Sequence, residues 1–228
     1  MVDLDVGQSD IGHVGTVAFG IVDREIALLS EAIPEYFYFY GYTSPLSDIP
    51  GYVYSLVRLL RKLKRVERER RVLIDTTGWI SGYSAFSLKL LKLELFRPDA
   101  VILIGSEVFD WYSYIKGFVK EVFLLLPSQY VVPKDMLRRE KNRIAITIKY
   151  FSEKPLVKLE KNLIPCVGKY STLEEGRLVG FLDSRFETLA TGWVVKDQGK
   201  EVLLHIYKQY EGKVSFLKIG DKVGGRNG

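Results

Sequence analysis

The sequence has little cysteine, little histidine and no long apolar run. Its single cysteine, Cys166, cannot form an internal disulfide, and two histidines are too few for a zinc cluster. No apolar run approaches the roughly 20 residues that a membrane-spanning helix needs, and the acidic residues Asp3, Asp5 and Asp10 are unlike a secretion signal. We expect a cytoplasmic protein without a membrane partner, in which Cys166 is a small core residue rather than a reactive thiol.

Positive charge is in excess and unevenly distributed. The formal net charge of +5 collects in two blocks, "RLLRKLKRVERERR" at residues 58–71 and "PKDMLRREKNR" at residues 133–143. Basic residues gathered in blocks indicate a polyanionic partner, although a solvated helix face explains the first block equally well. Since 47% of the 228 residues are hydrophobic, the chain can bury one large core or two small ones.

Strand patterns dominate the first 42 residues. Residues 2–6 predict a short buried strand that ends at Gly7. Residues 16–22, "TVAFGIV", and residues 26–33, "IALLSEAI", favour a hairpin. Aromatic residues alternate in "EYFYFYGY" at residues 35–42, which is typical of a strong strand. Turn residues with two prolines follow in "TSPLSDIPG".

Helical periodicity then alternates with short strands. Apolar residues at i, i+3, i+4, i+7 and i+10 predict an amphipathic helix on Val53, Leu56, Val57, Leu60 and Leu63. A second helix is predicted at residues 84–95, between the short strands "RVLID" and "AVILI". This order predicts an α/β fold with a parallel sheet and crossover helices. Ligands bind beyond the carboxyl ends of such strands, where "DVGQSD", "GYTSP" and "TTGW" are expected to converge.

The second half of the chain changes character. Residues 127–143 are polar, basic and punctuated by proline, which favours a connector or mobile segment over a core element. Short strand-like runs at spacings of about ten residues follow, the pattern of a small all-β domain. We predict three parts, with boundaries at residues 1–125, 126–160 and 161–228.

Four motifs in series carry a resemblance to a known family. They are "DLDVGQSDIG", "YFYFYGYTSP", "IDTTGW" and "LVGFLDS" with a later "ATGW", and an arginine-rich segment precedes the last. In this order they resemble the polynucleotide 5′-hydroxyl kinases, the family of the pre-mRNA cleavage-complex kinase, the pre-rRNA-processing kinase and their archaeal relatives. His13 and Val14 stand where the family usually has prolines, a difference expected to reshape a turn without affecting the chemistry.

The resemblance implies a partial P-loop NTPase fold, from the Walker B strand onward, in residues 1–125. Gly7 and Gly12 have the spacing of a GxxxxGK[ST] phosphate loop, but neither Lys nor a hydroxyl residue follows Gly12. The pairs Gly168–Lys169 and Gly212–Lys213 also lack the next Ser or Thr. In the family the phosphate loop lies on an earlier strand and helix. Three explanations stay open: a start assigned too late, a separate chain that supplies the P-loop, or a relative that only binds.

The resemblance also assigns the catalytic and metal residues. Asp5 is expected to orient the 5′-hydroxyl and to bind Mg²⁺, with Thr43 as a further metal-site residue. Asp3 either shares the metal or caps a neighbouring element. Catalytic arginines are expected in a lid at residues 126–160, with Lys134 and Lys141 interspersed among them, and we name Arg138 and Arg139. A solvated basic helix is the alternative for this lid.

Substrate-binding residues are assigned in the same way. Trp79 follows a glycine in a loop beyond a parallel strand, where it is suited to stack on a base, although core packing also explains a tryptophan. The full expected set is Gln8, Thr76, Gly78, Trp79 and Arg143.

The implied function is ATP-dependent phosphorylation of 5′-hydroxyl ends of RNA or DNA, with Mg²⁺ as cofactor and ATP as substrate. Without a P-loop the chain alone is expected to be inactive, since nothing in it cradles a triphosphate. The alternative is a non-catalytic protein that binds single-stranded nucleic-acid ends or acts as a scaffold. RNA or DNA 5′ ends are the expected partners, together with any separate chain that carries the P-loop.

Overall fold

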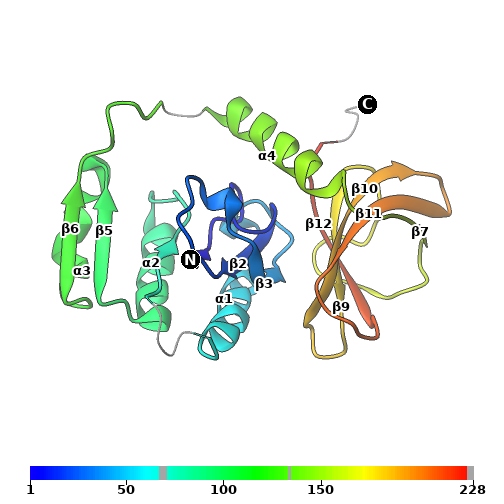
Figure 1. Cartoon of the computed structure of the whole chain (residues 1–228), viewed down its shortest axis with the longest axis horizontal. Coiled ribbons are helices and arrows are strands. Elements are labelled where there is room, and N and C mark those ends of the chain that lie inside the picture. The colour runs from blue at the N-terminus through cyan, green and yellow to red at the C-terminus, as the bar shows by residue number, and fades with distance from the viewer. Residues whose placement is uncertain (67–70, 133–134, 225–228) are drawn as a thin grey trace. The chain divides into compact units, whose positions relative to one another are not determined.

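The computed structural model describes residues 1–66, 71–132 and 135–224. Within it the chain forms two compact units (Figure 1), which are Met1–Thr77 with Asp135–Gly228 and, separately, Gly78–Lys134. Residues 67–70 of the first basic block and the predicted lid residue Lys134 lie outside the described residues. The boundaries after residues 125 and 160 remain predictions.

The N-terminal sheet has the order β3-β2-β1-β4. Its strands are β1 (Val2–Asp3), β2 (Thr16–Gly20), β3 (Pro34–Phe39) and β4 (Ile74–Asp75). β1 pairs in parallel with β4 and antiparallel with β2, and β2 pairs antiparallel with β3. β1, β3 and β4 therefore run in one direction and end at one edge, as expected for the loops that follow them.

The predicted hairpin partner of β2 is wrong. β2 pairs with β3, whereas residues 26–33 form only the short helix η1 (Leu29–Glu31), with Leu28 and Ile33 exposed. The aromatic strand offers far more apolar surface for burial, and its side chains from Tyr36 to Phe39 are at most 3% exposed. Hydrophobic burial thus selects the more distant segment over the nearer one.

Helix α1 (Ile49–Leu63) confirms the predicted amphipathic helix. The short helix η2 (Pro45–Ser47) precedes it, and Asp48 caps it by accepting a hydrogen bond from the Gly51 amide at 3.0 Å. The buried stripe is rotated slightly from the predicted one and consists of Tyr52, Ser55, Leu56, Leu59 and Leu63.

The C-terminal part confirms the predicted β-domain. Its six strands have the order β7-β11-β10-β9-β12-β8. They are β7 (Leu156–Glu160), β8 (Cys166–Val167), β9 (Arg177–Leu182), β10 (Thr188–Asp197), β11 (Glu201–Lys208) and β12 (Phe216–Lys222). Cys166 is exposed, so its prediction as a core residue is wrong, because it lies on the two-residue strand at the edge of this sheet.

Helix α4 (Met136–Phe151) corrects the prediction of a connector at residues 127–143. The helix begins after Asp135, whose carboxylate accepts a hydrogen bond from the Arg138 amide at 2.7 Å. Its second half enters a core cluster through Ile144 and Phe151, where it contacts residues of the N-terminal sheet and of β9. The segment is therefore helical from Met136 onward, but it stays exposed through Lys141 and joins the core only from Ile144.

The second unit contains a two-stranded parallel sheet and its connecting helices. Its elements are α2 (Tyr83–Phe96), β5 (Ala100–Ile104), η3 (Ser106–Trp111), α3 (Tyr112–Ile115) and β6 (Glu121–Leu125). β5 pairs in parallel with β6, and the predicted second helix and "AVILI" strand are confirmed. Across the described ranges, no helix combines the length and apolar character that a bilayer crossing requires.

His13 is fully buried where the N-terminal loop meets β10. Its Nδ1 lies 2.7 Å from the Val14 carbonyl oxygen, and its Nε2 lies 2.8 Å from the Thr191 hydroxyl. A carbonyl only accepts, so Nδ1 carries the proton and Nε2 accepts from Thr191. Burial lowers the pKa of His13 to about 4, which keeps the ring neutral. This residue thus ties the N-terminal loop to the C-terminal sheet.

Replacing His13 by glutamine is expected to change the pH dependence of stability. The unfolded chain takes up a proton near the ordinary histidine pKa of about 6.5, before the folded chain does, so acidification favours unfolding. With a folded pKa of about 4, stability worth about 2 kcal/mol is lost between about pH 7 and pH 5. Denaturant unfolding should show that the difference in free energy of unfolding between the unmodified protein and His13→Gln decreases by that amount on acidification. If this difference in free energy of unfolding stays constant with pH, His13 is not a buried neutral residue.

Candidate functional site

Asp5 lies two residues after the end of β1, at the edge where the three strands end. Its Oδ1 accepts hydrogen bonds from the amides of Gly7 at 3.0 Å and Gln8 at 3.2 Å. Within the part of the chain that the structure describes, its other oxygen, Oδ2, accepts no hydrogen bond. The residue is half-buried. One carboxylate oxygen thus shapes the loop and the second remains available to a ligand.

The hydrogen bonds of Asp3 support the interpretation that it caps a neighbouring element. Its Oδ1 accepts from the Asp5 amide at 2.8 Å. Its Oδ2 accepts from the Ser9 hydroxyl at 3.0 Å and from the amides of Asp10 at 2.6 Å and Ile11 at 3.0 Å. Burial raises the pKa of Asp3 to about 6, although these hydrogen bonds oppose the rise. With both oxygens bonded, Asp3 holds the loop that presents Asp5.

Gln8 connects this loop to helix α4. Its Nε2 donates to the Gly7 carbonyl at 2.9 Å and to the Arg139 carbonyl at 3.3 Å, while its Oε1 accepts from Asn142 Nδ2 at 2.8 Å. Asn142 was missed by the sequence reasoning. Its position four residues after Arg138 and three after Arg139, on one helix face, is the signal that would have found it.

Thr43 is held by the C-terminal sheet. Its amide and its hydroxyl both donate to Asp221 Oδ2, at 2.8 and 3.0 Å, and Asp221 Oδ1 accepts from the Tyr170 hydroxyl at 3.1 Å. The loops of Thr43 and Asp5 touch, since a Cβ added to Gly7 would lie 2.6 Å from the Thr43 carbonyl oxygen. Asp221 was also missed, because no local pattern links it to a residue 178 positions away.

Comparisons with known proteins show the family of this chain. Residues 1–153 match the family model described as "mRNA cleavage and polyadenylation factor CLP1 P-loop". A polyribonucleotide 5′-hydroxyl-kinase of Pyrococcus horikoshii is 30% identical over 79% of this chain and 54% of its own length. That of Thermococcus kodakarensis is 28% identical over 86% of this chain and 54% of its own length. The chain belongs to the polynucleotide 5′-hydroxyl kinase family.

A solved structure shares the fold of this chain. Clp1p in a complex with Pcf11p superposes with a TM-score of 0.67 over 96% of this chain and 66% of its own, at 9% sequence identity. A likeness at that identity shows the fold alone. The chain spans about half the length of the curated kinases it matches. The α/β fold with an additional C-terminal β-domain is therefore confirmed.

No phosphate loop of the kinase family lies among the residues that the structure describes. Gly168 and Lys169 follow the edge strand β8, where the Lys169 amide donates to the Tyr42 hydroxyl at 3.2 Å. Gly212 and Lys213 lie in the loop between β11 and β12. Neither pair opens a helix, as a phosphate loop does. These residues do not fit the triphosphate of ATP, and no reaction step is assigned to them.

The site fits Mg²⁺ in one restricted way. The described residues contain no group of three or more His, Cys, Asp or Glu side chains that could hold a metal ion. Mg²⁺ is commonly bound by one or two carboxylates together with substrate phosphates and water. The available oxygen of Asp5 suits such a shared ion. Thr43 stays a predicted metal-site residue, with its hydroxyl proton donated to Asp221.

The expected kinase-family residues of "TTGW" divide between the two units. Register pairs Asp3 with Asp75, and the Leu4 amide donates to the Asp75 carbonyl at 3.1 Å, which places Thr76 beside Leu4, the residue before Asp5, at the ends of β1 and β4. Gly78 and Trp79 begin the second unit, where Trp79 is half-buried. Base stacking by Trp79 remains a prediction.

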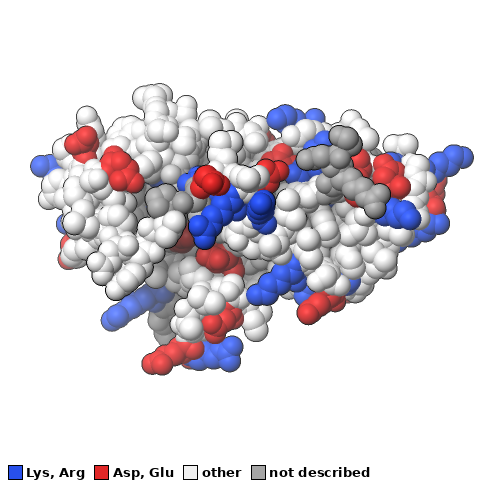
Figure 2. Space-filling model, turned by 90° about the horizontal axis from the view of Figure 1, so that it is seen from above, with Lys and Arg blue, Asp and Glu red and all other residues white. Residues whose placement is uncertain are grey.

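The arginines of the expected lid lie on α4. Arg138 and Arg139 are exposed and Arg143 is half-buried. On the side that α4 lines, Lys and Arg side chains are interspersed with Asp and Glu (Figure 2). None of the three arginines forms an ion pair with a described residue. Their guanidinium groups therefore remain available for phosphate oxygens.

Proposed function

We propose that the protein takes part in ATP-dependent phosphorylation of the 5′-hydroxyl ends of RNA or DNA. The observation that carries the proposal is the available carboxylate oxygen of Asp5, at an edge where the loops of Gln8, Thr43 and Thr76 meet. The family supports it, because relatives are named polyribonucleotide 5′-hydroxyl-kinases. The P-loop that holds ATP would come from further residues of the same protein or from a separate chain.

The residues take roles suited to phosphoryl transfer. Bound ATP supplies the phosphoryl group and Mg²⁺ neutralises charge on its oxygens. Asp5 orients the 5′-hydroxyl and accepts its proton, and Gln8 fixes the adjoining loop against α4. Arg138 and Arg139 stabilise negative charge on phosphate oxygens, while Arg143 and Thr76 hold the terminal nucleotide. Gly78 and Trp79, in the second unit, stay expected substrate-binding residues.

The second candidate is a protein that binds single-stranded ends without catalysis. It is favoured by the arginines on α4 that form no ion pair with a described residue. In that case Arg138, Arg139 and Trp79 still bind nucleic acid, and Asp5 has no catalytic role. Cytoplasmic localisation is part of either proposal.

Phosphate transfer by the protein isolated from its own cells tests the first proposal. An oligonucleotide with a 5′-hydroxyl should gain labelled phosphate from ATP in the presence of Mg²⁺, and the same oligonucleotide with a 5′-phosphate should gain none. Intact mass of that preparation, compared with the 26.1 kDa of this chain, shows whether further residues accompany it. Salt-sensitive binding of the oligonucleotide without any transfer would favour the end-binding protein instead.

A further inference from the structure

Three cations of the first basic block, which the proposed function does not use, lie on one face of α1. Arg61 is exposed, and Arg58 and Lys62 are half-buried. Residues three and four apart in a helix share a face, so the three side chains form one cationic stripe. A solvated helix face explains the charge of this stripe but not the aromatic rings beside it.

Two exposed aromatic side chains border the stripe, and a third lies in the β9–β10 hairpin that contacts Arg58. Tyr54 is 43% exposed, and the guanidinium carbon of Arg58 lies 5.9 Å from its ring centroid. Tyr210 is 36% exposed, and the Lys62 Nζ lies 5.1 Å from its ring centroid. Phe186 is 40% exposed in the β9–β10 hairpin. We call this surface the basic aromatic surface; it consists of Tyr54, Arg58, Arg61, Lys62, Arg185, Phe186 and Tyr210.

A direct contact joins the helix to the hairpin. Arg58 Nη1 donates to the Arg185 carbonyl at 3.3 Å, and Arg58 also pairs with the Glu187 carboxylate. Lys62 lies 3.7 Å from the same carboxylate. Arg61 and Arg185 form no ion pair with any described residue, so their positive charge is not neutralised. The surface thus presents free cations between exposed rings.

Phe186 adopts a backbone conformation that its side chain disfavours. Its φ is 59°, in the left-handed region that bulky residues rarely occupy, at a typical cost of about 1–3 kcal/mol. Glycine or asparagine would form this turn without strain. The ring stacks on Phe216 with centroids 5.0 Å apart and planes 1° apart, leaving its other face toward solvent. Formation of the turn does not explain why this residue is phenylalanine. A role as an aromatic ring on which a base stacks does explain it.

We propose that the basic aromatic surface binds single-stranded nucleic acid, with bases stacked on Tyr54, Phe186 and Tyr210. Exposed rings interleaved with free cations are the features of sequence-tolerant single-strand sites. Arg61 lies 12 residues beyond Ile49, where α1 begins, or about 18 Å along the helix. The surface is therefore distinct from the Asp5 edge, and it holds nucleotides distant from the 5′ end.

Binding of a labelled oligonucleotide of about 15 nucleotides to the whole chain, without ATP, tests the proposal. Phe186→Asn keeps the turn and removes the ring, so affinity should fall about tenfold while thermal stability stays equal or rises. The double variant Arg61→Ser with Arg185→Ser should weaken binding and reduce the slope of log K against log salt by about 1.4.

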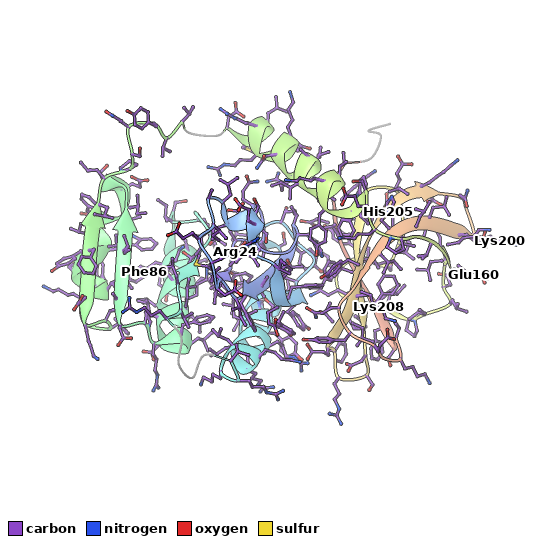
Figure 3. All side chains as sticks on the ribbon, viewed as in Figure 1. Arg24, Phe86, Glu160, Lys200, His205 and Lys208 are labelled. Carbon is purple, nitrogen blue, oxygen red and sulfur yellow. The ribbon has the colours of Figure 1, made fainter. Side chains whose placement is uncertain are left out.

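The matched control is Lys196→Ser with Lys200→Ser, which removes the same charge. Both lysines are exposed near the opposite end of β10, and Lys200 lies at the tip of the β10–β11 hairpin (Figure 3). This control should change affinity less than about twofold. If both double variants lose the same affinity for the oligonucleotide, the effect comes from net charge rather than from this surface, and the proposal is overturned. Unchanged affinity in Phe186→Asn would also overturn it and assign the surface to another partner, such as a protein.

The same variants separate this proposal from the proposed kinase function. Phosphorylation of a trinucleotide, which is too short to reach the basic aromatic surface, should be unaffected by Phe186→Asn. A protein that binds the long oligonucleotide through Phe186 but transfers no phosphate would refute the kinase function and leave this binding surface intact.

Discussion

Asp5→Asn is expected to lower the rate of 5′-phosphate transfer by about 10²- to 10⁴-fold, the range for loss of a group that accepts a proton. Asparagine keeps an Oδ1 acceptor for the amides of Gly7 and Gln8, so the loop retains its conformation. It replaces the available carboxylate oxygen by an amide nitrogen, which neither accepts the hydroxyl proton nor binds Mg²⁺. The loss should therefore appear in turnover, with the melting temperature nearly unchanged.

Asp23→Asn is the matched control for Asp5→Asn. Asp23 is an exposed carboxylate in the loop after β2, and its replacement removes the same charge from the same unit. Transfer rates of this control should equal those of the unmodified protein. Asp3 is unsuitable for this purpose, since it holds the loop through four donors. Full activity of Asp5→Asn would show that Asp5 is not the residue that acts on the hydroxyl.

The sequence predicted the parts of the site that follow from strand direction. β1, β3 and β4 end at one edge, and short buried strands followed by polar loops were sufficient to predict that "DVGQSD", "GYTSP" and the first residues of "TTGW" follow strands that end there. Helices α1 and α2 and strands β9 to β12 were also predicted, because each has its own periodicity, whereas α4 was not. The family was predicted from four motifs in order, and the match over residues 1–153 confirmed it.

The remaining contacts of the site are long-range and carry no periodic signal. Gln8 bonds to Asn142 across 134 positions, and Thr43 bonds to Asp221 across 178. Such pairs depend on how the C-terminal sheet and α4 pack against the N-terminal sheet, and single polar residues do not reveal this. The assignment of residues 161–228 as a separate small domain thus missed that Asp221 supports the candidate metal loop.

Gly220→Ala is expected to destabilise the protein by about 3 kcal/mol, the upper range for forcing an extra carbon into a packed site. A Cβ at Gly220 would lie 2.2 Å from the Gly41 carbonyl oxygen, and that oxygen accepts a hydrogen bond from the Asp221 amide at 2.7 Å. Backbone atoms cannot yield as a flexible side chain does. Either β12 or the loop that leads to Thr43 has to move.

That movement should affect the site as well as stability, because β12 carries Asp221 and the displaced loop carries Thr43. Gly212→Ala is the control: its Cβ would meet only the methyl groups of Leu189, at 3.0 and 3.1 Å, and should cost less than about 1 kcal/mol. Denaturant unfolding of both variants measures the difference. Equal stabilities would show that the contact between Gly41 and Gly220 is loose, and the position of Thr43 would then depend on its hydrogen bonds to Asp221 rather than on this contact.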